Sequence, residues 1–269
     1  MTEPPLDAAQ LSAAVVRAGG LWRSVEVVPV TGSTNADLLA RAAAGEPEGA
    51  VLVAEQQNAG RGRLGRAWVS PPRAALTFSV LLRPAAVPRA LLGWLPLLAG
   101  VAVAAAVRDV AAVDAQLKWP NDVLAGPGKL AGILAEAAGD AVVIGIGLNV
   151  STGPAELPPP GPGALPATSL HLEGSPNLDR ARLLAGILAG LERRYRTWSR
   201  VSGDPERSGL RAEYTGLCAT LGRRVRVELP AGRLLDGLAA GVDSAGRLLV
   251  SMPPAADLPV AAGDIVHLR

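Results

Sequence analysis

The sequence has very few of the residues on which disulfide-bonded and zinc-binding proteins depend. Its 269 residues include one cysteine, Cys218, and two histidines, His171 and His267. One cysteine cannot form an intrachain disulfide and suits a reducing compartment. With one cysteine and two distant histidines, an ordinary zinc site of His and Cys ligands cannot be assembled. No basic region followed by an apolar stretch begins the chain, so no secretion signal is indicated and we expect a cytoplasmic protein.

Aromatic residues and net charge are also low. Aromatic side chains make up 3% of the chain, and the 26 basic residues nearly balance the 24 acidic ones. This composition argues against a nucleic-acid surface built on stacking, so we expect no DNA partner. The one long uncharged run, residues 90–107, covers 18 positions, which is at the lower limit for crossing a bilayer. Pro96 and two glycines interrupt it, so we predict a core helix and no membrane partner.

A short segment rich in glycine and arginine is the most informative stretch. Residues 60–66 read Gly-Arg-Gly-Arg-Leu-Gly-Arg, a mobile backbone that carries permanent positive charge. From Gln56 to Arg108 there is no Asp or Glu, but there are seven arginines. A packed core rarely holds unpaired guanidinium groups, whereas a loop over an anion uses them, because arginine binds phosphate or carboxylate through paired hydrogen bonds. The segment predicts an anion-binding loop, and a solvated basic turn is the alternative.

The same seven residues fit the G-x-G-x-x-G pattern of dinucleotide-binding proteins. That pattern requires a strand before the glycines and a helix that begins at the third glycine, where the pyrophosphate binds. A strand is expected at residues 50–54. After the glycines, however, residues 68–72 read Trp-Val-Ser-Pro-Pro and an apolar run follows at 76–82, which indicates a turn and a strand. A Rossmann-type site is therefore not expected.

Lysine is scarce, and its positions are informative. The chain has 24 arginines but only two lysines, Lys118 and Lys129, eleven positions apart. This indicates a need for a compact ammonium group, which acts as a point charge and not as a planar fork. Lys118 begins the motif Lys-Trp-Pro-Asn-Asp, and Lys129 begins Lys-Leu-Ala-Gly-Ile-Leu-Ala-Glu. For the first motif, an Asn-Asp turn between two strands is the alternative interpretation.

Hydrophobic periodicity and turn residues predict a mixed α/β domain followed by a small β-barrel. Helices are expected over 6–18, 36–42, 90–108, 179–198 and 209–217, with Ser33 or Thr34 as the N-cap of the second. Strands are expected over 25–30, 50–54, 76–82, 115–119, 130–136 and 141–150, and a Pro-rich irregular loop over 153–166. After Leu221, short strands are expected over 224–229, 234–237, 248–250 and 263–268, with a turn at 230–232. We predict a domain boundary near residue 218, which divides the chain into 1–218 and 219–269.

Four segments together resemble one family, the biotin–protein ligases. They are Thr31-Gly32-Ser33-Thr34-Asn35, residues 54–66, Lys118–Asp122 with Lys129–Glu136, and Gly145-Ile146-Gly147-Leu148-Asn149-Val150. Their order and spacing match the family from about residue 25 to residue 150. The segment Ala167–Leu170 and the C-terminal barrel extend the resemblance nearly to the end. Each segment is weak evidence alone, whereas four in register are highly specific.

The resemblance implies a fold and a reaction. The family fold is an α/β (α+β) catalytic domain with a mixed sheet, like that of class II aminoacyl-tRNA synthetases, followed by a small SH3-like β-barrel. In the implied reaction, biotin attacks the α-phosphate of ATP to give biotinyl-5′-AMP and pyrophosphate. A lysine of a biotin carboxyl carrier protein domain, part of a biotin-dependent carboxylase, then accepts the biotinyl group. ATP, Mg²⁺ and biotin are thus implied, and catalysis is mostly positioning and charge neutralisation.

The resemblance also implies roles for individual residues. At the biotin end, where a ureido group needs donors and acceptors, it implies Ser33, Thr34, Asn35, Gln57, Gly60, Arg61, Gly62, Arg63, Lys129 and Gly132. For ATP or the adenylate it implies Arg63, Arg66, Trp68, Lys118, Asn121, Asp122, Lys129 and Asn149, with Asp122 as a magnesium ligand. Lys129, Arg63 and Arg61 are expected to be catalytic. For Trp68 and Trp119, core packing is the alternative.

The chain departs from the family pattern at three places. Gly32 stands where many members have a hydroxyl residue, and Leu64 stands where a basic residue is frequent. Only 30 residues precede Thr31, so we expect a ligase-only form, without the N-terminal winged-helix domain and repressor function of some members. The alternatives are a lipoate or octanoate ligase of the same superfamily, and a nucleic-acid binding module built on residues 56–108 and the small barrel.

Overall fold

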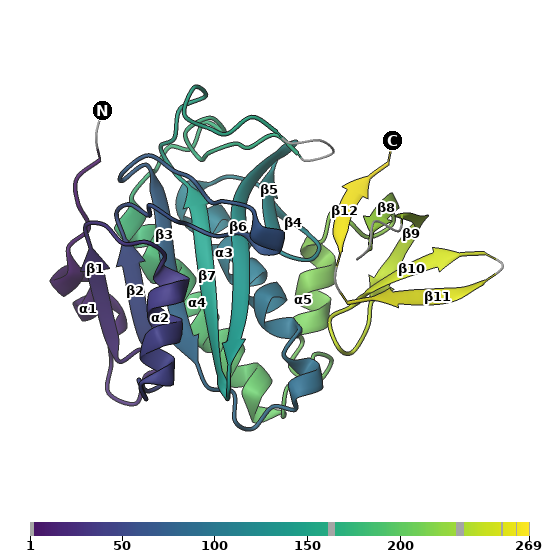
Figure 1. Cartoon of the computed structure of the whole chain (residues 1–269), viewed down its shortest axis with the longest axis horizontal. Coiled ribbons are helices and arrows are strands. Elements are labelled where there is room, and N and C mark those ends of the chain that lie inside the picture. The colour runs from purple at the N-terminus through teal and green to yellow at the C-terminus, as the bar shows by residue number, and fades with distance from the viewer. Residues whose placement is uncertain (1–2, 161–164, 230–233, 254, 262, 269) are drawn as a thin grey trace.

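A seven-stranded mixed sheet forms the centre of the molecule (Figure 1). The computed structural model describes residues 3–160, 165–229, 234–253, 255–261 and 263–268. The strands are β1 (Ser24–Val28), β2 (Ala50–Ala54), β3 (Ala75–Leu82), β4 (Ala115–Lys118), β5 (Asp122–Ala125), β6 (Gly128–Ala138) and β7 (Ala141–Asn149). Their order is β1-β2-β3-β7-β6-β5-β4, in which β1 and β2 are parallel and the other neighbours are antiparallel. This is the mixed sheet that the sequence predicts.

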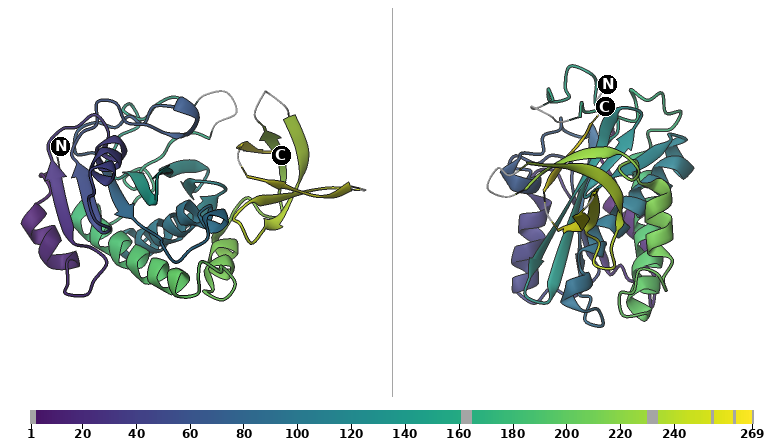
Figure 2. Two further views of the ribbon diagram at one scale, coloured as in Figure 1. Left: turned by 60° about the horizontal axis from the view of Figure 1, so that its bottom comes forward. Right: turned by 90° about the vertical axis from the view of Figure 1, so that its right-hand side faces the viewer.

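Helices cover both faces of this sheet (Figure 2). One face packs against α2 (Thr34–Ala43), and the other packs against α3 (Trp94–Ala111) and α4 (Arg180–Arg200). The helix α1 (Ala8–Val15) lies against β1 and α4, and α5 (Leu210–Leu217) lies against α3. Two single 3₁₀ turns, η1 (Arg63–Gly65) and η2 (Arg89–Leu91), precede β3 and α3. Ser33 is the N-cap of α2, as expected, and its side chain accepts from the N–H of Ala36.

Strand β3 shows why one face of the sheet holds the core and the other holds polar groups. Leu76, Phe78 and Val80 belong to the main core under α3 and α4. Side chains alternate along a strand, so Thr77 and Ser79 point to the opposite face. Both are buried there, close to the first turn of α2. These two positions place hydroxyl groups on an otherwise apolar surface beneath α2.

The helix α3 corresponds to the uncharged run of the sequence. It begins at Trp94 and not at residue 90, because η2 occupies residues 89–91. By length and composition alone it could cross a membrane, but 72% of it is buried within the protein. Its neighbours are α4, α5 and the strands β4 to β7. The prediction of a core helix is therefore confirmed.

The C-terminal strands form a separate five-stranded antiparallel sheet of the SH3-like kind. They are β8 (Arg224–Glu228), β9 (Leu234–Val242), β10 (Leu248–Met252), β11 (Ala255–Val260) and β12 (Asp264–His267), in the order β11-β10-β9-β8-β12. Two buried tryptophans attach this sheet to the large domain: Trp94 Nε1 donates to the carbonyl of Ser244 at 2.8 Å, and Trp119 Nε1 donates to that of Gly246 at 3.0 Å. For Trp119, the alternative of core packing is therefore the one observed.

Two strands were not predicted, β5 and β11, and two others, β6 and β9, are longer than predicted. β5 was not expected, because Asn121 and Asp122 indicated a turn. The turn is shorter than that, so Asp122 already pairs with Lys118 across β4 and β5. β11 was also not expected, and it contains Pro259, which a central strand does not tolerate. Among the described strands, β11 pairs only with β10, and proline is accepted at such an edge. The irregular loop is confirmed at 153–160 and 165–166, whereas 161–164 and the predicted turn at 230–232 lie outside the described residues.

Candidate functional site

Two neighbouring cavities lie beneath the segment that connects β2 to β3. The first has a volume of about 40 Å³ and is enclosed by the start of α2, by β3, β6 and β7, and by that segment. The second has a volume of about 180 Å³ and lies between the same segment, the β4–β5 turn, β6 and the C-terminal sheet. Gly62 and Trp68 line both cavities. The two cavities are therefore parts of one site that Trp68 divides.

The first cavity has a polar end formed by α2 and Gln57. Gln57 Oε1 accepts from the backbone N–H of Thr34 at 2.8 Å and from its hydroxyl at 3.0 Å. Ser79 Oγ lies 2.7 Å from Thr34 Oγ1 and 2.6 Å from Asn35 Oδ1. Ser33, which is the N-cap of α2, and the next two residues, Thr34 and Asn35, are all buried. The cavity thus presents several donors and acceptors in a small buried space, as recognition of a ureido group requires.

Glu136 belongs to this site, although it was not among the predicted site residues. Asn35 Nδ2 donates to Glu136 Oε2 at 2.8 Å, and Arg61 Nη2 lies 3.6 Å from Glu136 Oε1. Glu136 therefore connects the polar end of the first cavity with Arg61 of the segment between β2 and β3. The sequence did contain a signal: in β6, residues 132, 134 and 136 share one face, so a carboxylate follows a glycine and a leucine that line the cavity.

Glycines in β6 and β7 make room for the side chains of the site. A Cβ at Gly147 would lie 2.3 Å from the ring of Trp68, and a Cβ at Gly145 would lie 2.2 Å from Asn35 Oδ1. At Gly132 a Cβ would lie 3.3 Å from the Trp68 ring and 3.4 Å from Lys129 Nζ. Trp68 therefore rests on two glycine backbones between the cavities and is not part of the hydrophobic core.

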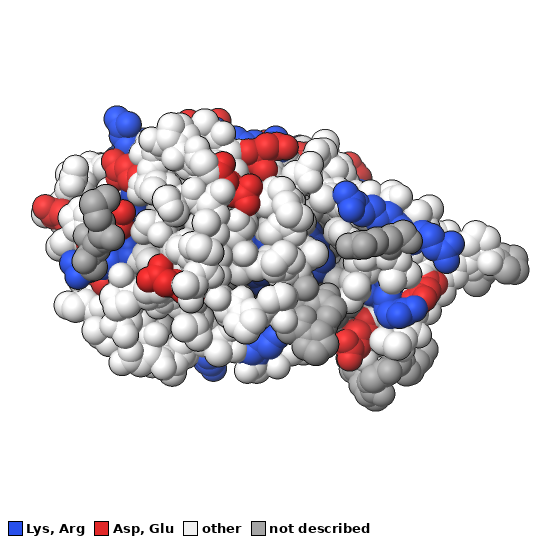
Figure 3. Space-filling view, turned by 90° about the horizontal axis from the view of Figure 1, so that it is seen from above, with Lys and Arg blue, Asp and Glu red and all other residues white. Residues whose placement is uncertain are grey.

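Six of the fourteen residues that line the second cavity are charged, and four of these six are cations. Lys129 Nζ lies 2.7 Å from Asp122 Oδ1, and Lys118 Nζ lies 4.0 Å from Asp122 Oδ2. The pairing of β4 with β5 explains this, because it places Lys118 directly opposite Asp122. Arg63, Arg66 and Asn121 also line the cavity, and Glu228, Ile265 and Val266 extend it onto the C-terminal sheet. Figure 3 shows basic atoms inside the hollow between the large domain and the C-terminal sheet.

The cationic loop, residues 60–66, lies over both cavities. Arg61 faces Glu136 at the first cavity, as described, and Arg63 Nη1 donates to Asn121 Oδ1 at 3.2 Å and to the carbonyl of Gly263 at 3.5 Å. Gly60 has no room for a side chain, since a Cβ would lie 2.4 Å from the carbonyl of Trp68. At the tip, Leu64 adopts the left-handed conformation, with φ at 55°. The arginines are thus distributed over the two cavities.

Asn149 is the one predicted nucleotide residue that lines neither cavity. It is buried, and its Nδ2 donates to the carbonyl of Thr168 at 2.9 Å. The N–H of Thr168 in turn donates to the carbonyl of Lys129 at 2.9 Å, and the N–H of Lys129 donates to Pro166. Asn149 therefore holds residues 166–168, which are hydrogen-bonded to the backbone of Lys129.

A histidine of the C-terminal sheet, His267, has a lowered pKa, chiefly because it is partly buried. Burial, followed by the positive charges of Lys118 and Arg223, lowers the pKa of His267 to about 4. Its Nε2 lies 3.1 Å from the hydroxyl of Thr220. The imidazole is therefore neutral near pH 7 and adds no further cation to this region.

Asp122 is suited to one type of metal site. In the described part of the chain, no three His, Cys, Asp or Glu side chains gather around a common point, so a metal held by the protein alone is not supported there. Mg²⁺ with a nucleotide is different, because it commonly takes one or two carboxylates and completes its shell with phosphate oxygens and water. One carboxylate between two lysines in the second cavity fits that arrangement.

Comparisons with known proteins agree with this geometry. Residues 27–149 match the Biotin/lipoate A/B protein ligase family. A biotin--[acetyl-CoA-carboxylase] ligase of Mycobacterium tuberculosis is 47% identical over 270 residues, covering 99% of this chain and 97% of that one. A biotin protein ligase of Aquifex aeolicus, solved with biotin and ATP, has a TM-score of 0.75 at 27% identity over 91% of this chain and 98% of that one. The Leishmania major ligase with biotinyl-5-AMP has a TM-score of 0.61 at 26% identity, covering 91% and 98% of the two chains.

Proposed function

The chain belongs to the biotin–protein ligase family, and we infer its activity from that membership. It is a biotin--[acetyl-CoA-carboxylase] ligase, which uses ATP to convert biotin to biotinyl-5′-AMP and transfers the biotinyl group to a carboxylase. The observation that carries this function is the pair of cavities joined at Trp68, one with a polar end, the other cationic. The roles of single residues, the carrier lysine and Mg²⁺ are our proposals.

At the polar end of the first cavity, Gln57, Thr34 and Asn35 bind the ureido ring of biotin. Gln57 and Thr34 are already oriented by their mutual hydrogen bonds, and Asn35 is fixed by Ser79 and Glu136. Such preorganisation limits the entropy that must be lost on binding. The ring would displace part of these internal contacts, and the acyl chain would extend past Gly132 toward the second cavity.

Charge neutralisation is the main chemical task of the second cavity. The biotin carboxylate and the α-phosphate of ATP repel each other, so adenylation needs fixed cations at their meeting point. Lys129 stands at the boundary, close to Gly132 of the first cavity and to Asp122 of the second. We assign Lys129 to the carboxylate and α-phosphate, with Arg61 and Arg63 reaching them from the loop. Mg²⁺, when bound, would reduce the charge of the outer phosphates, and Asp122 would hold it.

The cationic loop protects the adenylate between the two half-reactions. Biotinyl-5′-AMP is an activated acyl group that water would hydrolyse, so the site must exclude water until the carrier lysine arrives. Arg63 already connects the loop to Asn121 and to the C-terminal sheet. Trp68, which lies between the cavities, contacts the adenine or the acyl-phosphate group that links biotin to AMP.

Pyrophosphate exchange tests the first half-reaction. The protein is incubated with ATP and radiolabelled pyrophosphate, and exchange into ATP should depend on biotin. Exchange driven by lipoate but not by biotin would identify the lipoate or octanoate ligase instead. For the second half-reaction, a biotin carboxyl carrier protein domain mixed with biotin, ATP, Mg²⁺ and the protein should gain the mass of one biotinyl group. The expected absence of a repressor function stays a prediction, which a DNA-binding assay can address.

A further inference from the structure

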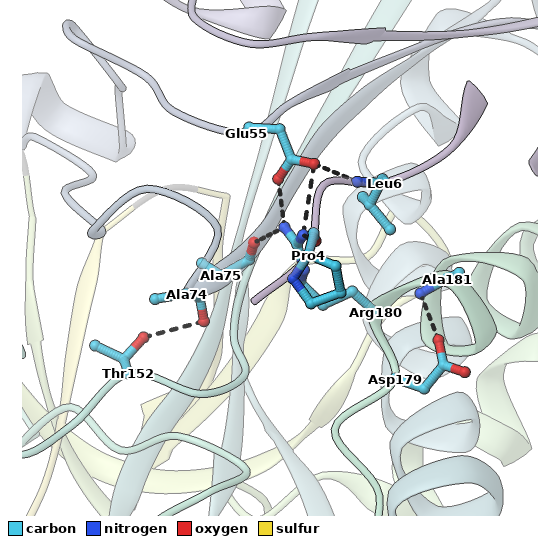
Figure 4. A network of polar contacts seen from close by, with 9 residues as sticks. All are labelled: Pro4, Leu6, Glu55, Ala74, Ala75, Thr152, Asp179, Arg180 and Ala181. Atoms are coloured by element: carbon cyan, nitrogen blue, oxygen red, sulfur yellow. Dashed lines mark hydrogen bonds and ion pairs between the residues drawn. The ribbon is translucent and has the colours of Figure 1, made fainter. Parts of the chain in front are cut away.

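A buried ion pair outside the two cavities joins Glu55 to Arg180 (Figure 4). Glu55 directly follows β2, and Arg180 is the first residue of α4. Arg180 Nη1 donates to Glu55 Oε2 at 2.5 Å, and the two side chains are only 4% and 9% exposed. Burying two charges is costly unless further hydrogen bonds satisfy the remaining atoms. The other partners of the pair therefore indicate what it holds together.

These partners lie at both ends of the segment that covers the site, residues 56–74. Glu55 precedes the segment, and its carbonyl accepts from the N–H of Arg73 at 2.9 Å. Arg180 Nη1 also lies 3.5 Å from the carbonyl of Ala75, the first residue after the segment. The pair thus fixes the points at which the segment leaves the sheet and returns to it.

The N-terminal chain completes the same cluster. The N–H of Leu6 donates to Glu55 Oε1 at 2.5 Å, and Arg180 Nη2 donates to the carbonyl of Pro4 at 2.6 Å. Arg180 Nη2 also lies 3.4 Å from Glu55 Oε1. Residues 4–6 therefore supply the donor and the acceptor that the pair needs, and they lie against the base of the segment, as Figure 4 shows.

Further along the segment, single contacts attach it to the rest of the protein, among them those of Arg61 with Glu136 and of Arg63 with Asn121. Backbone hydrogen bonds attach Asn58 to Thr31 and Ala59 to Gly32, and Gln57 lies only two residues after Glu55. At the tip of the cationic loop, Leu64 is 71% exposed. The placement of the loop over the cavities therefore depends on these contacts and on where its base is fixed.

We propose that Glu55 and Arg180 are positioning residues for biotin activation, and that Pro4 and Leu6 belong to the same unit. The unit fixes the base of segment 56–74, so that Gln57 and the cationic loop meet the biotinyl adenylate in register. Glu55 and Arg180 line neither cavity, so they act through the segment and not on the substrate. The inference rests on the proposed ligase function.

A second buried carboxylate provides a matched control. Glu192 of α4 accepts from the N–H of Leu21 at 2.9 Å and lies 3.1 Å from Arg196 and 3.5 Å from Arg17. It also attaches the N-terminal part of the chain to α4, but its partners lie away from segment 56–74. Glu192→Gln should therefore weaken the fold as Glu55→Gln does, without moving the base of the segment.

The experiment measures the release of biotinyl-5′-AMP from the full chain. Radiolabelled adenylate is formed on the protein from biotin and ATP, and its dissociation is followed after a chase with unlabelled adenylate. Urea unfolding and the KM for biotin are measured on the same samples. Glu55→Gln and Arg180→Lys should release the adenylate about tenfold faster, a loss of about 1.4 kcal/mol, and should raise the KM for biotin. Glu192→Gln should release it at the wild-type rate.

Two results would overturn the proposal. One is a folded Glu55→Gln protein that retains the adenylate as wild type does, and the other is a Glu192→Gln protein that releases it equally fast. If Glu55→Gln does not fold, two variants of Leu6 test the proposal in its place. Leu6→Pro removes the N–H that donates to Glu55, whereas Leu6→Ala keeps it. Only Leu6→Pro should therefore speed release of the adenylate. Equal release rates in the two variants would refute the positioning role of this unit. A wild-type protein that forms no adenylate would instead refute the ligase function itself.

Discussion

Replacing Lys129 by alanine is the substitution that most directly probes charge neutralisation in the site. At an effective dielectric constant of 20, two unit charges about 4 Å apart interact by about 4 kcal/mol. The Lys129 side chain is 32% exposed, so solvent screens part of this, and we take about 3 kcal/mol for its effect on the transition state. That value corresponds to an adenylation rate reduced about a hundredfold.

The same substitution should leave folding almost unchanged. Partly exposed ion pairs contribute about 0–1 kcal/mol to stability, and Asp122 keeps Lys118 at 4.0 Å after the change. Biotin-dependent pyrophosphate exchange measures the rate, and urea unfolding measures stability. Arg182→Ala is the control, because Arg182 is an exposed cation on α4. A Lys129→Ala protein with near-normal exchange would refute the assignment of Lys129, whereas one that unfolds early would show a structural role.

Three further predictions follow from the same site. Arg63→Ala, which loses the bonds to Asn121 and to Gly263, should mainly speed dissociation of the adenylate, and an unchanged dissociation rate in a chase experiment would contradict this. Gly147→Ala places a Cβ 2.3 Å from the Trp68 ring and should weaken adenylate binding in calorimetry. When Trp68 is already replaced by alanine, adding Gly147→Ala should cause no further loss of adenylate affinity. Because the folded-state pKa of His267 is lowered to about 4 from 6.5, the unfolded chain binds more protons between these values, so stability should fall as pH drops from 6.5 toward 4. In His267→Gln this part of the pH dependence of urea unfolding should disappear, and an unaltered dependence would exclude His267 as its source.

Local sequence features predicted the elements of the large domain well. β2 agrees with its expected range, 50–54, to the residue, and the cap of α2 at Ser33 is confirmed. The start of α3 was less predictable, since an uncharged apolar run does not distinguish the preceding 3₁₀ turn from the helix itself. β11 was not predicted; it contains Pro259, which is acceptable only at an edge, and the pairing order is not visible in the sequence.

Site residues that belong to short sequence motifs could be predicted. Pairs of residues that lie far apart in the sequence could not. The structure brings Ser33, Gln57 and Gly132 to one cavity and Lys118, Asp122 and Lys129 to the other, whereas their roles stay predictions. Glu55 and Arg180 are 125 residues apart. With 24 arginines in the chain, no local pattern indicates which of them pairs with a given carboxylate. Asn149, expected at the nucleotide, lines neither cavity and donates to the carbonyl of Thr168.

The most direct test of the account is a crystal structure of the protein with biotinyl-5′-AMP. The account predicts that residues 60–66 close over the ligand, with Arg61, Arg63 and Lys129 within hydrogen-bonding distance of its acyl-phosphate group. It also predicts the ureido ring between Gln57 and Asn35. A structure in which the loop and Lys129 point away from the bound adenylate would contradict the central claim that these cations neutralise the reacting anions.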